Sequence, residues 1–158
     1  MSATLSEIRQ GLVGTWKLVS YVSTPAGRSG PVNHPMGADV QGYIIYGEDG
    51  YMSAQLMTPS SKLYKDSENF LQASDDEASQ AARNYLAYTG PYEVFELDGK
   101  PVVRHIMNLS LVPNWAGHDQ LRRCELKGSS LTLGPTQPWR LNGVLVDQTL
   151  TWTKVGRQ

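Results

Sequence analysis

The sequence predicts an all-β fold, an antiparallel barrel of eight to nine strands with a short N-terminal helix and one inserted helix. Two observations support this prediction. Most of the chain consists of short segments in which apolar and polar residues alternate, as they do in strands with one buried face. Tight turns join most of these segments, so consecutive strands pair as a meander, and a meander of this length tends to close. An eight-stranded interior accommodates side chains or one small ligand.

The first half of the chain contains the opening strand, a hairpin and both helices. Residues 14–22 (GTWKLVSYV) alternate in hydrophobicity, which predicts a strand. Residues 40–58 contain two β-prone runs around an Asp-Gly pair, which predicts a hairpin with a tight turn. The other predicted elements are a helix over 4–12 with Thr4 or Ser6 as its cap, a Gly- and Pro-rich loop over 23–39, and a helix over about 77–86 with Asp75 or Asp76 as its cap.

The second half alternates with few interruptions. A turn at 98–100 separates its first two strands, and a Pro-containing loop over 135–143 precedes its last strand. The predicted strands are 90–97, 101–112, 120–127, 130–134 and 144–154.

One titratable ring lies in an otherwise apolar strand face. The segment HIMNLSLVPNW (105–115) begins with a histidine whose same-face neighbours are all hydrophobic. Because side chains alternate along a strand, the predicted inward set is Val103, His105, Met107, Leu109 and Leu111. His105 is therefore expected to face the barrel interior.

The same alternation predicts inward sets on three further strands and leaves the two faces of the 40–58 hairpin open. The sets are Trp16, Leu18, Ser20 and Val22; Gln120, Arg122, Cys124 and Leu126; and Val144, Val146, Gln148, Leu150 and Trp152. Several of these residues are polar, and an unpaired buried polar group costs roughly 1–3 kcal/mol. These groups are therefore expected to pair with one another, with water, or with a molecule that enters the barrel.

Composition excludes several classes of protein. The chain of 158 residues has a net charge of −1 and no basic stripe, which argues against nucleic-acid binding. Its single cysteine, Cys124, allows no internal disulfide and is expected to be a buried, inert thiol. No segment resembles a signal peptide or a membrane helix. We expect one domain over 1–158, a cytoplasmic location and no membrane partner; a homodimer is compatible with the sequence.

Several segments together resemble the lipocalin-like domain family of bacteria and fungi. GTWKLVSY (14–21) is similar to the Gly-x-Trp opening of lipocalins, and the more specific segment is VVRHIMNLSLVPNWAGHDQLRR (102–123). Further matching pieces are GYIIYGEDGYMSAQL (42–56), NYLAYTGPYEV (84–94), LTL (131–133) and LTW (150–152). The resemblance implies a lipocalin-like barrel with a central cavity. Some fungal relatives are associated with natural-product clusters, where such barrels can act as cofactor-free cyclases or isomerases.

The resemblance also suggests where this chain departs from the family. Lipocalins often place a late-strand arginine over the opening tryptophan, but Lys154 follows LTWT here. This leaves Arg122, Arg123 or Arg140 as candidates for the cation over Trp16.

His105 and Arg122 are the candidate catalytic residues. His105 is either a general acid or base, or a neutral interior histidine bonded to a tyrosine or a carbonyl. Arg122 either stabilises negative charge on a ligand oxygen or forms a cation–π lid on Trp16.

The predicted substrate-binding residues are mostly aromatic or amphipathic. They are Trp16, Tyr46, Tyr51, Ser53, Tyr88, Met107, Trp115 and Gln120. One or two tyrosines are expected to bind a ligand carbonyl, with Tyr85 and Tyr92 as further candidates. Trp115 either stacks on a bound ring or closes the barrel end. The three histidines, including His34 and His118, lack metal-ligand spacing, and no dinucleotide or phosphate motif is present, so no metal or cofactor is expected.

Two functions remain open. The first is a cofactor-independent, pericyclase-like cyclase or isomerase in secondary-metabolite biosynthesis, which holds a hydrophobic polyketide- or terpenoid-type molecule in a reactive geometry. The alternative is a non-catalytic carrier for a small hydrophobic ligand, because apolar walls with few polar groups describe a binding site equally well.

Overall fold

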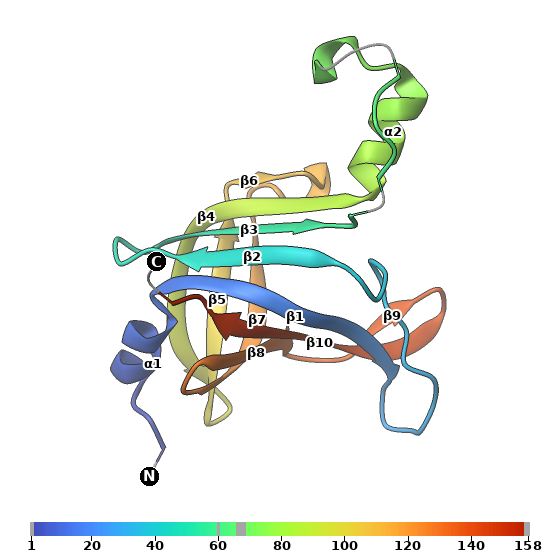
Figure 1. Cartoon of the computed structure of the whole chain (residues 1–158). Coiled ribbons are helices and arrows are strands. Elements are labelled where there is room, and N and C mark those ends of the chain that lie inside the picture. The colour runs from blue at the N-terminus through green and yellow to red at the C-terminus, as the bar shows by residue number, and fades with distance from the viewer. Residues whose placement is uncertain (1, 60, 66–68, 157–158) are drawn as a thin grey trace.

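The structure is a computed structural model that describes residues 2–59, 61–65 and 69–156. Eight antiparallel strands pair in the order β1-β2-β3-β4-β5-β7-β8-β10, and β10 pairs with β1 to close the barrel (Figure 1). These strands are β1 (Gly14–Pro25), β2 (Gln41–Tyr46), β3 (Tyr51–Met57), β4 (Tyr85–Leu97), β5 (Lys100–Met107), β7 (His118–Lys127), β8 (Ser130–Pro135) and β10 (Val144–Lys154). The predicted antiparallel barrel with two helices is confirmed.

Two short strands and two 3-10 turns lie beside the barrel strands. Strand β6 (Leu109–Ser110) pairs with β4, and β9 (Trp139–Leu141) pairs with β10. The 3-10 turns are η1 (Phe70–Gln72) and η2 (Pro113–Trp115). No helix among the described residues is long and apolar enough to cross a membrane.

The helix α1 (Leu5–Leu12) covers one end of the barrel. Thr4 and Glu7 form a capping box that satisfies its first N–H groups, so Thr4 rather than Ser6 is the cap. Ile8 and Leu12 are buried in the main core, and the Trp16 indole donates to the Leu12 carbonyl at 2.8 Å. This end of the barrel is therefore filled by side chains.

The second helix, α2 (Asp75–Arg83), stands away from the barrel together with η1 (Figure 1). Its cap is Ser74, one residue before the predicted caps, and it ends earlier than predicted because β4 begins at Tyr85. None of its described side chains is buried.

One-residue irregularities reverse the side-chain alternation in two strands. In β1 the pairing with β10 shifts between Leu18 and Ser20, and the extra residue, Val19, is 61% exposed. Beyond the bulge, Tyr21 lines the cavity and Ser23 is buried, so the prediction that Ser20 and Val22 face inward is wrong.

The predicted strand 101–112 also changes register. β5 ends at Met107, and the pairing with β4 slips by one residue before β6, where Leu109 pairs with Thr89. Leu109 is 67% exposed and Leu111 is 40% exposed, so their predicted inward placement is wrong. Gly90 permits the crossing, since a Cβ there would collide with the Ile106 carbonyl.

The structure also decides the faces of the 40–58 hairpin. Ile44 and Tyr46 on β2, and Met52, Ala54 and Leu56 on β3, are buried. The alternate residues of both strands therefore lie on the outer face.

Candidate functional site

A cavity of about 570 Å³ lies in the half of the barrel away from α1. Its inner wall combines apolar side chains, such as Leu133 and Leu150, with a small set of polar groups. Trp115 and Trp139 lie at its rim, where Trp139 is 42% exposed. The volume is within the range of about 300–1,000 Å³ that is typical of small-molecule sites.

His105 is fully buried on the cavity wall between Tyr46 and Gln120. Its Nε2 lies 2.7 Å from the Tyr46 hydroxyl, and its Nδ1 lies 2.9 Å from the Gln120 Oε1. The arrangement that satisfies all three groups has Nδ1–H donating to Gln120 and Nε2 accepting from Tyr46. Burial lowers the pKa of His105 to about 4, so the ring is neutral at neutral pH. Both ring nitrogens are therefore occupied within the protein.

Tyr46 and Tyr88 are also buried beside this ring. Burial raises the pKa of Tyr46 well above its usual value, and that of Tyr88 as well, so both phenols are protonated at neutral pH. Both rings lie with centroids 5.8 Å from that of His105. No described residue hydrogen-bonds to the Tyr88 hydroxyl.

Arg122 faces the cavity from β7. Among the described residues its one hydrogen-bond acceptor is the neighbouring Leu121 carbonyl, at 3.1 Å from Nη1, and none of the described carboxylates forms a salt bridge with it. Burial lowers the pKa of its guanidinium, yet the group remains charged at neutral pH because its ordinary pKa is so high. The cavity therefore contains a guanidinium without a carboxylate partner among the described residues.

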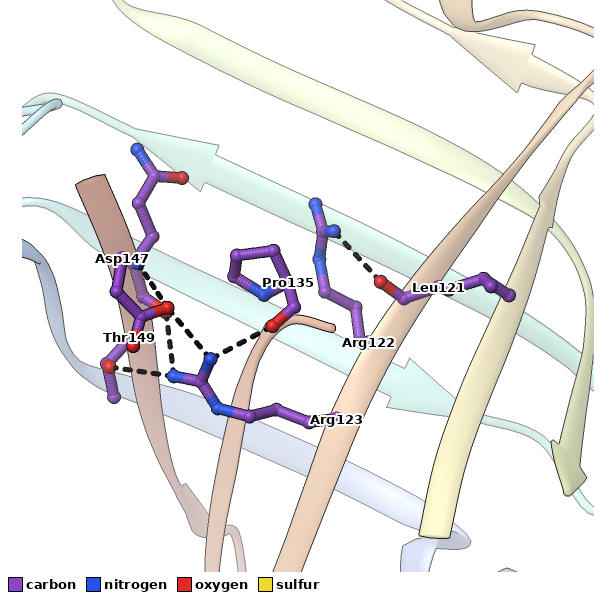
Figure 2. Close-up of polar contacts among 7 residues, drawn as sticks. Leu121, Arg122, Arg123, Pro135, Asp147 and Thr149 are labelled. Carbon is purple, nitrogen blue, oxygen red and sulfur yellow. Dashed lines mark hydrogen bonds and ion pairs between the residues drawn. The ribbon is translucent and has the colours of Figure 1, made fainter. Parts of the chain in front are cut away.

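The next residue, Arg123, points to the opposite side of β7, and both of its terminal nitrogens donate hydrogen bonds (Figure 2). Its guanidinium donates to Asp147 Oδ1 at 2.8 Å and to the Pro135 carbonyl at 2.9 Å. It also donates to the Gln148 carbonyl and to Thr149 Oγ1, at 3.1 and 3.2 Å. Arg123 thus links β7, β8 and β10 on the outside of the barrel.

The cation over the opening tryptophan is Lys154. Its Nζ lies 5.1 Å from the centroid of the Trp16 ring and donates to the Gly11 carbonyl at the end of α1, at 3.0 Å. The prediction that Arg122, Arg123 or Arg140 takes this position is wrong, because the backbone directs both β7 arginines elsewhere.

The structure gathers six of the predicted site residues around the cavity. These are His105, Arg122, Tyr88, Met107, Trp115 and Gln120. Tyr46 is hydrogen-bonded to His105 but does not line the cavity itself, while Trp16 is buried beside Lys154 and α1. Tyr51 and Ser53, which were predicted to bind substrate, lie on the outer face of β3, away from the cavity lining.

Two other predicted tyrosines lie away from the cavity lining. Tyr85 bonds to Gln55 on the outer face at 2.6 Å, and the Tyr92 hydroxyl donates to the Gly47 carbonyl at 2.8 Å. Among the described residues, no group of three or more His, Cys, Asp or Glu side chains could hold a metal ion. Burial raises the pKa of the Cys124 thiol to about 12, so this group is not a nucleophile at neutral pH.

Two residues of the cavity wall, Tyr21 and Trp139, were not predicted from the sequence as site residues. Tyr21 enters the cavity only because of the β1 bulge, and its hydroxyl donates to Gln148 Oε1 at 3.3 Å. Trp139 lies in a segment that reads as a Pro-containing loop, and no signal in that loop identifies it as a rim residue.

A family model described as a lipocalin-like domain matches residues 13–155. This chain belongs to that family. The lipocalin-like chain is also similar to a protein of Aspergillus oryzae named 4'-hydroxy-3'-methoxypropiophenone carrier protein. The two are 36% identical over 110 residues, which cover 67% of this chain and 98% of the relative. No solved structure matches the lipocalin-like chain significantly.

Proposed function

We propose that this lipocalin-like protein is a non-catalytic carrier that binds a small aromatic ketone in its lumen during natural-product biosynthesis. The observation that carries the proposal is a cavity of about 570 Å³ with mainly apolar walls and a few inward polar groups. The name of the Aspergillus relative, a carrier of a hydroxylated aryl ketone, supports the same class of ligand.

The chemistry of the cavity favours carriage over catalysis. A general acid or base needs a free nitrogen or oxygen within reach of the ligand and a pKa near the working pH. His105 has both nitrogens occupied by Tyr46 and Gln120, and its pKa of about 4 makes it a weak base. The cyclase or isomerase hypothesis, with His105 as a proton-transfer group, is the alternative that an assay for chemical conversion of the ligand tests.

Calorimetry with 4'-hydroxy-3'-methoxypropiophenone tests the carrier function. We expect one molecule to bind per chain with a Kd on the order of micromolar, about −8 kcal/mol. This value is well within the limit of about −1.5 kcal/mol per non-hydrogen atom for small ligands. Chromatography after prolonged incubation should recover the ketone unchanged.

A pair of matched variants locates the binding site. Met107→Trp places a bulky indole ring in the lumen and should weaken binding at least tenfold. Met57→Trp makes the same change on the outer face and should leave the Kd unchanged. Absence of binding by the parent protein would refute the carrier function. Conversion of a candidate metabolite by the parent protein, lost in Met107→Trp, would establish an enzyme instead.

A further inference from the structure

The inner part of the lumen offers hydrogen-bond donors but few free acceptors. Gln120 Oε1 is occupied by His105, and Gln148 Oε1 is occupied by Tyr21. Each bond leaves the amide NH₂ group of that glutamine without a protein partner among the described residues, and both glutamines line the cavity. The His105 N–H and the Tyr21 hydroxyl thus orient the two amide groups, and the amide N–H groups are left available to a guest.

Tyr88 and Arg122 add further donors to the inner wall. The Tyr88 hydroxyl has no partner among the described residues, and Arg122 uses only one N–H, on the Leu121 carbonyl. A guanidinium carries five N–H groups and accepts none. A guest that brings acceptor oxygens would satisfy these donors, whereas a guest O–H group would rely on the second lone pairs of the glutamine oxygens and on the tyrosine hydroxyls.

Charge points to the same kind of guest. Arg122 is positive, is half-buried on the cavity wall and has no salt bridge among the described residues. A partly desolvated charge without a counter-ion is unfavourable, and an anion placed beside it offsets part of that cost. The carboxylate on the described lining, that of Asp119, is half-exposed and is paired with Arg104 at 3.5 Å.

We propose that the lumen binds its ligand as an oxyanion, the conjugate base of an acidic phenol or enol, with Arg122 as the counter-ion. This inference rests on the proposed carrier function and specifies the chemical form that is carried. A para-hydroxyaryl ketone fits this description, because ionisation of its hydroxyl delocalises negative charge onto the carbonyl oxygen. The ligand loses its proton to solvent, and both of its oxygens then act only as acceptors.

The tyrosines that face Arg122 from three other strands do not supply a competing charge. Tyr21 on β1, Tyr46 on β2 and Tyr88 on β4 all have raised pKa values and stay neutral. The other charged or titratable groups nearby are His105 on β5 and, on β7 itself, His118, Asp119, Arg123 and Cys124. The Asp119 carboxylate is paired with Arg104. His105 and Cys124 are neutral, and Arg123 adds further positive potential from the outer face.

Spectrophotometric titration of bound 4'-hydroxy-3'-methoxypropiophenone tests the inference, because its phenolate absorbs at longer wavelength than its phenol. With protein in excess, the midpoint of the phenol-to-phenolate transition should fall by at least one pH unit relative to the free compound. One unit corresponds to about tenfold preference for the anion. The 4'-O-methyl ether, which cannot ionise, should bind at least tenfold more weakly at pH 8.

Three variants assign the effect to the guanidinium. Arg122→Gln should return the midpoint to the free value or above it, and Arg122→Lys should retain part of the shift. Lys127→Gln removes an exposed charge from the far end of the same strand and should leave the midpoint unchanged. Circular dichroism establishes that each variant is folded.

The outcomes separate the two proposals. If the parent protein binds the phenol and its methyl ether equally well and the midpoint does not fall, anion selectivity is refuted while the carrier function stands. If neither compound binds, both proposals are refuted. A lowered midpoint that persists in Arg122→Gln would refute the role of Arg122.

Discussion

The two faces of β7 use the same side chain for opposite purposes. Arg123 on the outer face makes four hydrogen bonds to β8 and β10, and one of them is to a carboxylate (Figure 2). Arg122 on the inner face makes one hydrogen bond and no salt bridge among the described residues. A satisfied guanidinium stabilises a fold, whereas an unsatisfied one retains its capacity to bind a guest. The comparison indicates that Arg122 contributes less than Arg123 to the stability of the fold, because its N–H groups are left available to a ligand.

The largest expected effect concerns the inner face and pH. The pKa of His105 falls from about 6.5 in the unfolded chain to about 4 in the fold, so only the unfolded chain takes up this proton between those values. The free energy of unfolding should therefore fall as pH drops from 6.5 to 4, by about 3 kcal/mol from this group. Urea unfolding across this range measures the change. His105→Gln should show a correspondingly shallower dependence, and an unchanged slope would show that the ring is not held neutral.

The next effect separates the two arginines directly. Arg123→Ala removes all four bonds and leaves Asp147 without its ion-pair partner, so we expect a loss of about 2 kcal/mol, a value reduced by the partial exposure of both groups. Arg122→Met should change the free energy of unfolding by less than about 1 kcal/mol, since it removes a charge without a partner. Urea unfolding at pH 7 compares them. Equal losses in both variants would contradict the division of roles.

The smallest expected effect concerns the packing around the Arg123 guanidinium on the outer face. A Cβ at Gly134 would lie 2.5 Å from Arg123 Nη2 and 2.5 Å from the Gln148 carbonyl oxygen. Gly134→Ala should therefore displace the guanidinium and cost roughly 1–2 kcal/mol, since the arginine can move aside but the Gln148 backbone must also shift. Combining it with Arg123→Ala should cost less than the sum of the two changes. Strict additivity would show that Gly134 does not act through Arg123.

Much of the barrel follows from local sequence. The alternation in 14–18, 103–107 and 144–152 placed Trp16, His105 and Gln148 correctly, because a strand's side-chain period is fixed by its backbone. The prediction failed where one residue is inserted into a pair of strands. The bulge at Val19 and the slip before Leu109 reverse the inner and outer faces, and neither interrupts the hydrophobic pattern enough to be recognised.

The candidate site was less accessible to sequence reasoning than the fold. Tyr51 and Tyr46 are chemically alike and lie in one hairpin, yet only the closed sheet decides that Tyr46 is buried and Tyr51 is exposed. The sequence by itself determined an antiparallel barrel with an inward imidazole and guanidinium, since these depend on period and turn chemistry. Only the tertiary structure decided that both nitrogens of His105 are hydrogen-bonded, that Lys154 covers Trp16 and that Arg122 has no salt bridge among the described residues. Each of these depends on which side chains the fold brings together from distant strands.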